Sequence, residues 1–182
     1  MTEMEQIIAM LKKILEYLSD DSTETPEEPK FGPSYYMAQA LKPSDVELIK
    51  ESEGLRLKAY LPTKNDVWTI GWGHTHGVFP GQVISREEAT EFLYTDLAWV
   101  QKALNRYVEV PLTQNMYDSL TSFIFNLGET NFRTSTLLKK LNGKDYKGAA
   151  NELPRWNKQK GKPLTGLTIR RAKERDLFLK GM

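Results

Sequence analysis

The chain has 182 residues, of which 40% are hydrophobic and 27% are charged. This length and balance predict one globular domain with a buried core, plus an appendage. The absence of cysteine excludes disulfides, thiol catalysis and cysteine-rich zinc sites. No apolar run reaches the roughly 18 residues of a transmembrane helix. The N-terminus also lacks a secretory-signal pattern, so we expect any export to depend on a membrane pore or on cell breakage.

The net charge of +1 hides an asymmetry along the chain. Residues 1–30 hold three lysines against eight acidic residues, a net of −5, and the remainder has a net of +6. A basic domain favours an anionic partner, such as a cell-wall polymer or nucleic acid, although an unevenly charged, solvated surface explains the count equally well.

The first 40 residues predict an arm in two parts. Residues 1–18 are expected to form an amphipathic helix, because the apolar residues Met4, Ile7, Leu11, Ile14 and Leu18 recur three and four apart. This helix either pairs with copies of itself or docks on the domain. Residues 19–40 are acidic and rich in proline at their start, which is typical of an extended linker, and residues 41–182 form the predicted domain.

The domain opens with signals for a helix and a hairpin. Ser44 and Glu47 have the spacing of a capping box, and Gly54 is placed to end the helix. Residues 55–60 and 67–72 are expected to be strands joined by a turn.

The rest of the chain is expected to be helical. A second capping box at residues 85–88 predicts one long helix to about residue 107. Further helices are expected from Thr113 to Gly128 and over residues 135–141, 145–153 and 168–179. A small β lobe with a larger helical lobe is an α+β arrangement.

Glu53 is the strongest candidate for catalysis. It shares the apolar face of its helix with Val46 and Ile49, and it lies in the last turn. Partial burial and the negative end of the helix dipole both favour a neutral carboxyl, which can protonate a leaving oxygen. The alternative is a glutamate that is ion-paired with Arg56 or with another buried base.

The predicted hairpin carries further polar candidates. Asp66 or Thr69 could hold a water for attack on an acetal carbon, but Asp66 also suits a turn, and Thr69 suits an ordinary strand. His74 and His76 follow without a metal-like set around them, so we interpret them as structural or as substrate-lining, and we expect neither a metal nor a cofactor.

The motifs E-G-L-R-L-K-A-Y and T-I-G-W-G-H-T, which run from Glu53 to Thr75, resemble the phage lysozymes of glycoside hydrolase family 24. The similarity continues in F-N-L-G-E-T, S-T-L-L, P-R-W and G-L-T-I-R-R-A-K-E-R and covers roughly residues 41–182. It implies a two-lobed lysozyme fold and cleavage of peptidoglycan between N-acetylmuramic acid and N-acetylglucosamine, with lysis of a bacterial host.

The resemblance also implies roles for individual residues. The general acid falls on Glu53, and the threonine thought to position the nucleophilic water falls on Thr69. Substrate contacts in the helical lobe fall on Phe125, Asn126 and Ser135. His74 matches the family's histidine, close to the site and more plausible as a structural residue.

The sequence departs from the family at the catalytic aspartate. That position is Pro62 here, and Asp66 is the acid left in a hairpin one residue longer. Asp66 takes over the role, or the role is absent. Some relatives without the aspartate are transglycosylases, which form an anhydro product, and a wall-binding module without activity is a further alternative. We expect no nucleic-acid partner, because the basic run at residues 170–175 is interpreted as a solvated helix face.

Overall fold

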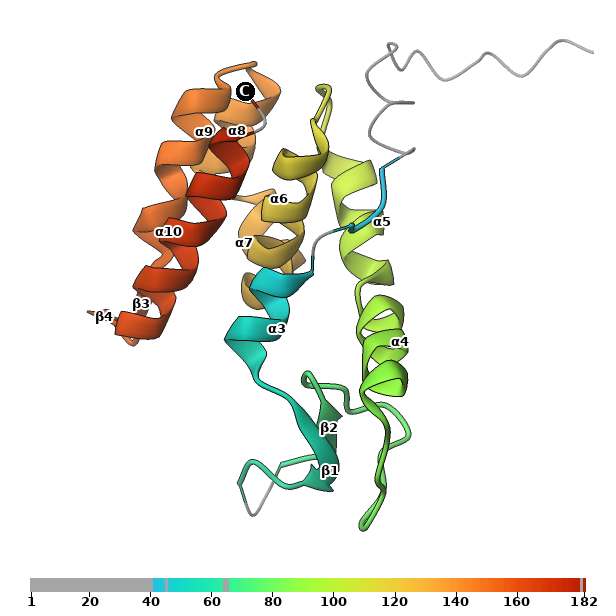
Figure 1. The fold of residues 1–182 in the computed structure, drawn as a ribbon. Coiled ribbons are helices and arrows are strands. Elements are labelled where there is room, and N and C mark those ends of the chain that lie inside the picture. Colours follow the sequence, from blue (N-terminus) through green and yellow to red (C-terminus); the bar gives the residue numbers. More distant parts are fainter. Residues whose placement is uncertain (1–40, 45, 64–65, 181) are drawn as a thin grey trace, which may run out of the picture. The chain divides into compact units, whose positions relative to one another are not determined.

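The computed structural model describes residues 41–44, 46–63, 66–180 and 182. The predicted N-terminal helix and its linker lie outside these residues. Within the described part, two small antiparallel hairpins accompany a set of helices (Figure 1), which confirms the α+β class. None of the helices in these ranges is long and apolar enough to cross a membrane.

Helix α3 (Glu47–Glu53) begins without the expected capping box. Val46 is its N-cap, and no side chain caps the first turn. The Ser44 backbone amide and hydroxyl instead donate to the buried carboxylate of Asp118, at 2.9 and 2.7 Å. A contact across the domain has therefore replaced the local cap. Gly54 ends the helix as predicted, with φ of 72° and its amide bonded to the Lys50 carbonyl.

Strands β1 (Arg56–Tyr60) and β2 (Thr69–Gly71) form the predicted hairpin. Arg56 pairs with Gly71 and Tyr60 with Thr69, so the register shifts between the two pairs. The other edge of β1 is bonded to residues 82–84, where Ile84 donates to the Leu57 carbonyl at 3.0 Å.

The predicted long helix is two helices, α4 (Arg86–Asp96) and α5 (Ala98–Tyr107). The capping box of Ser85 and Glu88 is present and starts α4. Leu97, with a ψ of −9°, is both the C-cap of α4 and the N-cap of α5, so the helix is interrupted at this residue. Helix α4 packs on β2 whereas α5 packs on α6. The interruption therefore allows the two halves of the predicted helix to pack on different elements.

Helix α6 (Gln114–Leu127) is the most buried helix of the described part, and Gly128 ends it as predicted. The Thr113 hydroxyl caps its first turn. The shorter helices that follow are α7 (Glu129–Arg133), α8 (Thr136–Asn142), α9 (Tyr146–Glu152) and the 3-10 helix η1 (Leu153–Trp156). The expected helices at 135–141 and 145–153 are thus present, and α7 was not expected.

The last part of the chain holds a second hairpin that was not expected. Strands β3 (Lys158–Gln159) and β4 (Lys162–Pro163) pair across a turn in which Lys160 and Gly161 have φ of 50° and 79°. Helix α10 (Thr165–Leu179) follows and packs against α6, α3 and η1. This packing carries the C-terminal helix to the end of α3, where Glu53 lies.

Candidate active site

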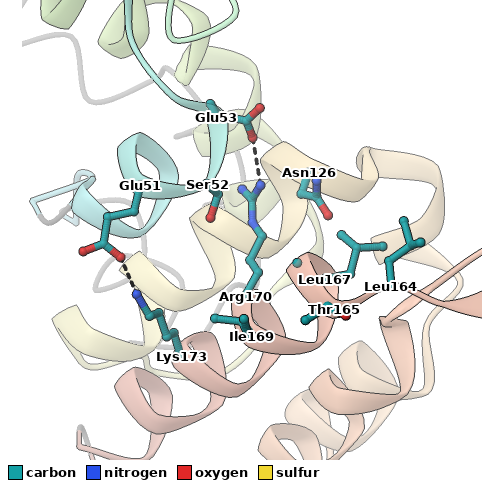
Figure 2. Close-up of a pocket in the computed structure, with 11 residues that line it drawn as sticks. Glu51, Ser52, Glu53, Asn126, Leu164, Thr165, Leu167, Ile169, Arg170 and Lys173 are labelled. Atoms are coloured by element: carbon teal, nitrogen blue, oxygen red, sulfur yellow. Dashed lines mark hydrogen bonds and ion pairs between the residues drawn. The ribbon is translucent and has the colours of Figure 1, made fainter.

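Glu53 is the last residue of α3, and its side chain retains 29% exposure. Its Oε1 lies 2.8 Å from Nη1 of Arg170 on α10 (Figure 2). From the sequence we expected either a partly buried carboxyl at the negative end of the helix or a glutamate that is ion-paired with a basic residue. The structure therefore matches the alternative of an ion-paired glutamate. The base is Arg170, whereas Arg56 lies over the ring of Tyr60.

Arg170 is held in place by contacts through each of its three guanidinium nitrogens. Nη1 donates to Glu53, Nε donates to Glu174 Oε1 at 3.2 Å, and Nη2 donates to the Ser122 carbonyl at 3.1 Å. The side chain is only 5% exposed. A planar fork bound on three sides has little freedom, so it fixes the position of the Glu53 carboxylate.

Glu174 lies beneath this pair and is fully buried between two arginines. Its Oε1 accepts from the Ser122 hydroxyl at 2.7 Å, and its Oε2 lies 3.1 Å from Nη1 of Arg171. Burial raises the pKa of the Glu174 carboxyl against the opposing effect of its partners, and burial lowers the pKa of Arg171 to about 10.

The sequence-based interpretation of residues 170–175 as a solvated helix face is therefore wrong for three of its members. Arg170, Arg171 and Glu174 are all buried. The i,i+3 and i,i+4 spacing of Glu174 from the two arginines signals a local ion pair. It did not reveal that the pairs face inward, since that depends on α10 packing on α6.

A pocket of about 580 Å³ lies beside Glu53. Figure 2 shows it bounded by the end of α3, by Asn126 on α6 and by the first turns of α10. One side carries the ion pairs Glu53–Arg170 and Glu51–Lys173, and the other carries apolar side chains. Leu164 on that side is 41% exposed. A pocket with both polar and apolar walls suits a sugar ring, which has hydroxyl edges and apolar faces.

The structure places the residues predicted to contact the substrate in three different environments. Asn126 lines the Glu53 pocket, and its Oδ1 accepts from Arg171 at 2.7 Å. Phe125, the preceding residue of α6, lines a different pocket together with His76 and Trp99. Ser135 is buried and caps α8, accepting from the Leu138 amide and donating to the Phe132 carbonyl. These bonds give Ser135 a structural role as the N-cap of α8.

Thr69 and Asp66 are also placed by local bonds. Thr69 is buried in β2, and its hydroxyl donates to the Val67 carbonyl at 3.0 Å. Asp66 is exposed, and its carboxylate accepts from the Thr63 hydroxyl at 2.9 Å. Neither residue is among those lining the pocket beside Glu53. Their catalytic roles stay predictions.

His74 fixes the segment after β2 to α4. Its Nδ1 lies 2.9 Å from both carboxylate oxygens of Asp96, and its ring stacks on Phe92 with centroids 4.4 Å apart. The side chain is buried. This environment supports the structural interpretation of His74. Among the described residues, no group of three or more metal-ligating side chains comes together.

Comparisons with known proteins agree with this architecture. The family model for phage lysozyme matches residues 50–174. The endolysin of Acyrthosiphon pisum secondary endosymbiont phage 1 is 53% identical over 135 residues, which are 72% of this chain and 92% of that protein.

Two solved structures are similar in fold and sequence. A mutant of P22 lysozyme shares 41% identity at a TM-score of 0.71, over 76% of this chain and 97% of its own. The muramidase domain of SpmX from Asticaccaulis excentricus shares 39% identity at a TM-score of 0.70, over 76% of this chain and 98% of its own.

The small β-hairpin joined to a helical lobe, together with these similarities, identifies a glycoside hydrolase of the lysozyme type. The chain belongs to the phage lysozyme family. It is a lysozyme-type hydrolase of peptidoglycan, as the resemblance predicted, and the expected family, fold and activity are confirmed.

Proposed function

We propose that the chain cleaves the β-1,4 bond between N-acetylmuramic acid and N-acetylglucosamine, with Glu53 as the general acid. The observation that supports this role is the placement of the Glu53 carboxyl. It ends a helix at a glycine, faces a pocket of sugar size, and is oriented by a buried arginine.

The ion pair organises the two oxygens of Glu53 differently. Oε1 faces Nη1 of Arg170, which leaves Oε2 for the glycosidic oxygen. Oε2 carries the proton that the leaving group receives as the bond to the anomeric carbon breaks. The developing positive charge on the sugar ring then lies near a carboxylate, which stabilises it.

A water completes the reaction on the opposite face of the sugar. We assign its positioning to Thr69, with Asp66 as the candidate for the second carboxylate. Attack from the far side gives inversion if the two carboxyl groups lie about 6.5–9.5 Å apart when the substrate is bound. The hydrogen bond from Thr63 to the Asp66 carboxylate also supports a role for Asp66 in stabilising the turn.

The setting of the reaction follows from the substrate. We propose that the chain is made in the cytoplasm of a bacterial host and reaches the wall after release through a damaged or permeabilised membrane. Cleavage of the wall glycan then lyses the host.

Product analysis on purified peptidoglycan tests the proposal. We expect muropeptides with reducing N-acetylmuramic acid ends, and we expect Glu53→Gln to stop their release while the variant still folds and binds the wall. The amide oxygen of that variant can still accept from Arg170, so the geometry is preserved. Glu51→Gln is the matched control, because Glu51 is on the same helix and lines the same pocket but pairs with Lys173 at the surface.

Two results would contradict the proposal. Activity retained by Glu53→Gln would remove that residue from the role of acid. Anhydro ends in the products would mean that no water is added and that the chain is a transglycosylase.

A further inference from the structure

Two residues that line the pocket, Glu53 and Asn126, are connected through a chain of buried charged side chains. Arg170 contacts Glu53 and also Glu174, whose carboxylate is fully buried. Glu174 in turn lies against Arg171, and Nη2 of Arg171 donates to Oδ1 of Asn126 at 2.7 Å. Arg170 therefore holds the candidate acid, whereas Arg171 holds an amide at the same pocket.

Arg171 has little freedom to move away from this amide. Its side chain is fully buried, and its Nη1 lies 3.1 Å from Oε2 of Glu174. Its guanidinium lies 5.0 Å from the centroid of the Phe123 ring. A different position of the guanidinium would remove one partner from the buried Glu174 carboxylate, which is costly. The contact with Asn126 is therefore a fixed feature of the pocket wall.

The orientation of the Asn126 amide follows from the chemistry of its partner. A guanidinium has donors and no acceptor, so the oxygen of the amide must face Arg171 and the nitrogen must face away from it. Within the described part of the chain, the structure shows no hydrogen-bond partner for that nitrogen, Nδ2. Asn126 is half-buried and lines the pocket (Figure 2), so its N–H groups are available to a ligand there.

An amide nitrogen held in this way selects a ligand group that only accepts hydrogen bonds. A sugar hydroxyl both donates and accepts, so it could bind the amide in either orientation and would gain little from Arg171. A carboxylate is disfavoured, because Glu51 and Glu53 already line the pocket. The strong acceptor that remains on a cell-wall glycan is the carbonyl oxygen of its N-acetyl groups.

We propose that Arg171 is a positioning residue that presents the Asn126 amide nitrogen to the carbonyl oxygen of a sugar N-acetyl group, so that the enzyme selects N-acetylated glycan. The inference rests on the proposed function, because both sugars at the scissile bond carry an N-acetyl group on the carbon next to the anomeric one. Figure 2 shows Leu164 and Leu167 on the same side of the pocket as Asn126, where they offer apolar surface to the acetyl methyl group.

Asn126→Asp tests the role of the amide nitrogen. The aspartate keeps an oxygen for Arg171 and replaces the NH2 group by a second acceptor. The matched control is Asn151→Asp, because Oδ1 of Asn151 accepts from Arg175 of the same helix but lies at the surface and outside the pocket. The substrates are purified peptidoglycan and the same material after a deacetylase has removed its N-acetyl groups.

We expect Asn126→Asp to raise KM on N-acetylated peptidoglycan roughly tenfold, because the pocket loses one hydrogen bond and an acceptor faces the carbonyl oxygen. Added salt should not change this loss, since the N-acetyl group is uncharged. On de-N-acetylated peptidoglycan the variant should bind at least as well as the unmodified chain, because its carboxylate accepts from the free ammonium group. Asn151→Asp should match the unmodified chain on both substrates.

Two substitutions of Arg171 test its positioning role. Arg171→Met removes the donor and allows the amide to turn, so we expect KM on N-acetylated peptidoglycan to rise about threefold with kcat unchanged, since Arg170 still holds Glu53. Arg171→Lys keeps a cation that can only donate, and it should restore most of the affinity. Thermal unfolding verifies that each variant is folded.

A measurement on the unmodified chain avoids any buried substitution. The side-chain amide signal of Asn126 in a 15N NMR spectrum can be assigned by its absence from Asn126→Asp. We expect this signal to shift when the tetramer of N-acetylglucosamine is added, and to stay in place with the tetramer of glucosamine.

Four outcomes would overturn the inference. An unchanged KM of Asn126→Asp on N-acetylated peptidoglycan, or an amide signal that does not respond to the acetylated tetramer, would show that the donor is not used. An equal loss on both substrates would assign the donor to another group of the glycan. Equal KM values for folded Arg171→Met and the unmodified chain would show that Asn126 needs no positioning. The proposed function fails in a distinguishable way, since the unmodified chain would then release no products from N-acetylated peptidoglycan.

Discussion

The Glu53 carboxylate and the Arg170 guanidinium are 117 residues apart in the chain and 2.8 Å apart in the structure. Only a guanidinium can reach Glu53, Glu174 and the Ser122 carbonyl at once, because it offers three nitrogens in a fixed plane. Both the positive charge and the planar shape of the Arg170 guanidinium therefore contribute to holding Glu53 in position.

Substituting Arg170 by lysine separates these two properties. We expect Arg170→Lys to keep the positive charge but lower kcat by about tenfold or more, because Glu53 is no longer held in one orientation. Stability should fall by roughly 1–3 kcal/mol, since buried acceptors lose their donors. The control is Arg175→Lys on the same helix, where Arg175 donates two bonds to Asn151 at the surface. Equal activity of the two variants would contradict the orienting role.

Glu174 is expected to be the most sensitive position of this network for folding. Glu174→Gln removes the negative charge between Arg170 and Arg171, both of which are buried. Loss of one partner of a buried ion pair costs about 3–5 kcal/mol. Glu51→Gln removes an ion pair to the same helix at the surface, where both side chains are half exposed, and should cost about 1 kcal/mol or less. Urea unfolding of both variants measures the difference, and similar costs would refute the interpretation.

Thr69 and Asp66 can be distinguished by substitutions that preserve shape. Thr69→Val removes the hydroxyl, and we expect a loss of activity of about 100-fold from a misplaced water. Thr69→Ser should retain most of the activity. Asp66→Asn keeps an acceptor for the Thr63 hydroxyl, and we expect a smaller effect than at Thr69. An equally large loss for Asp66→Asn would assign this residue the role of second carboxylate.

We expect Glu152 to account for part of the loss of stability of the fold in acid. A hydrogen bond from Lys140 at 2.6 Å is the main cause that lowers the pKa of this carboxyl below 4.5, with Arg155 assisting. Because the folded pKa is lower than the unfolded one, the stabilisation is present above pH 4.5 and is lost as the pH falls through the folded value. Glu152→Gln should therefore destabilise the protein by about 1 kcal/mol at neutral pH. The difference should vanish in strong acid, and unfolding at several pH values checks this; a difference independent of pH would contradict it.

The role of residues 1–18 remains a prediction from the sequence. If this helix pairs with its copies through its apolar seam, the full chain should sediment as an oligomer, and a truncation that begins at Phe31 should sediment as a monomer. Analytical ultracentrifugation of both proteins decides the point. Monomeric mass for the full chain would exclude self-association and favour docking on the domain.

The sequence alone determined the local structure wherever a short pattern fixes it. Ser85 and Glu88 form their capping box, and Gly54 and Gly128 end their helices, because these devices need only neighbours within about one turn. The motifs around Glu53 also indicated the family. Glu53 was identified as the candidate acid because its residue type and position at the helix end are both readable in the sequence.

The tertiary structure decided everything that depends on distant partners. Ser44 donates a hydrogen bond to Asp118 instead of capping α3. The predicted long helix is interrupted at Leu97, because α4 and α5 pack on different elements. The tertiary structure also turned Arg170 and Arg171 inward to Glu53 and Glu174. A charged residue in a helix pattern can face solvent or an opposite charge, and only the packing of α10 on α6 and α3 selects between the two.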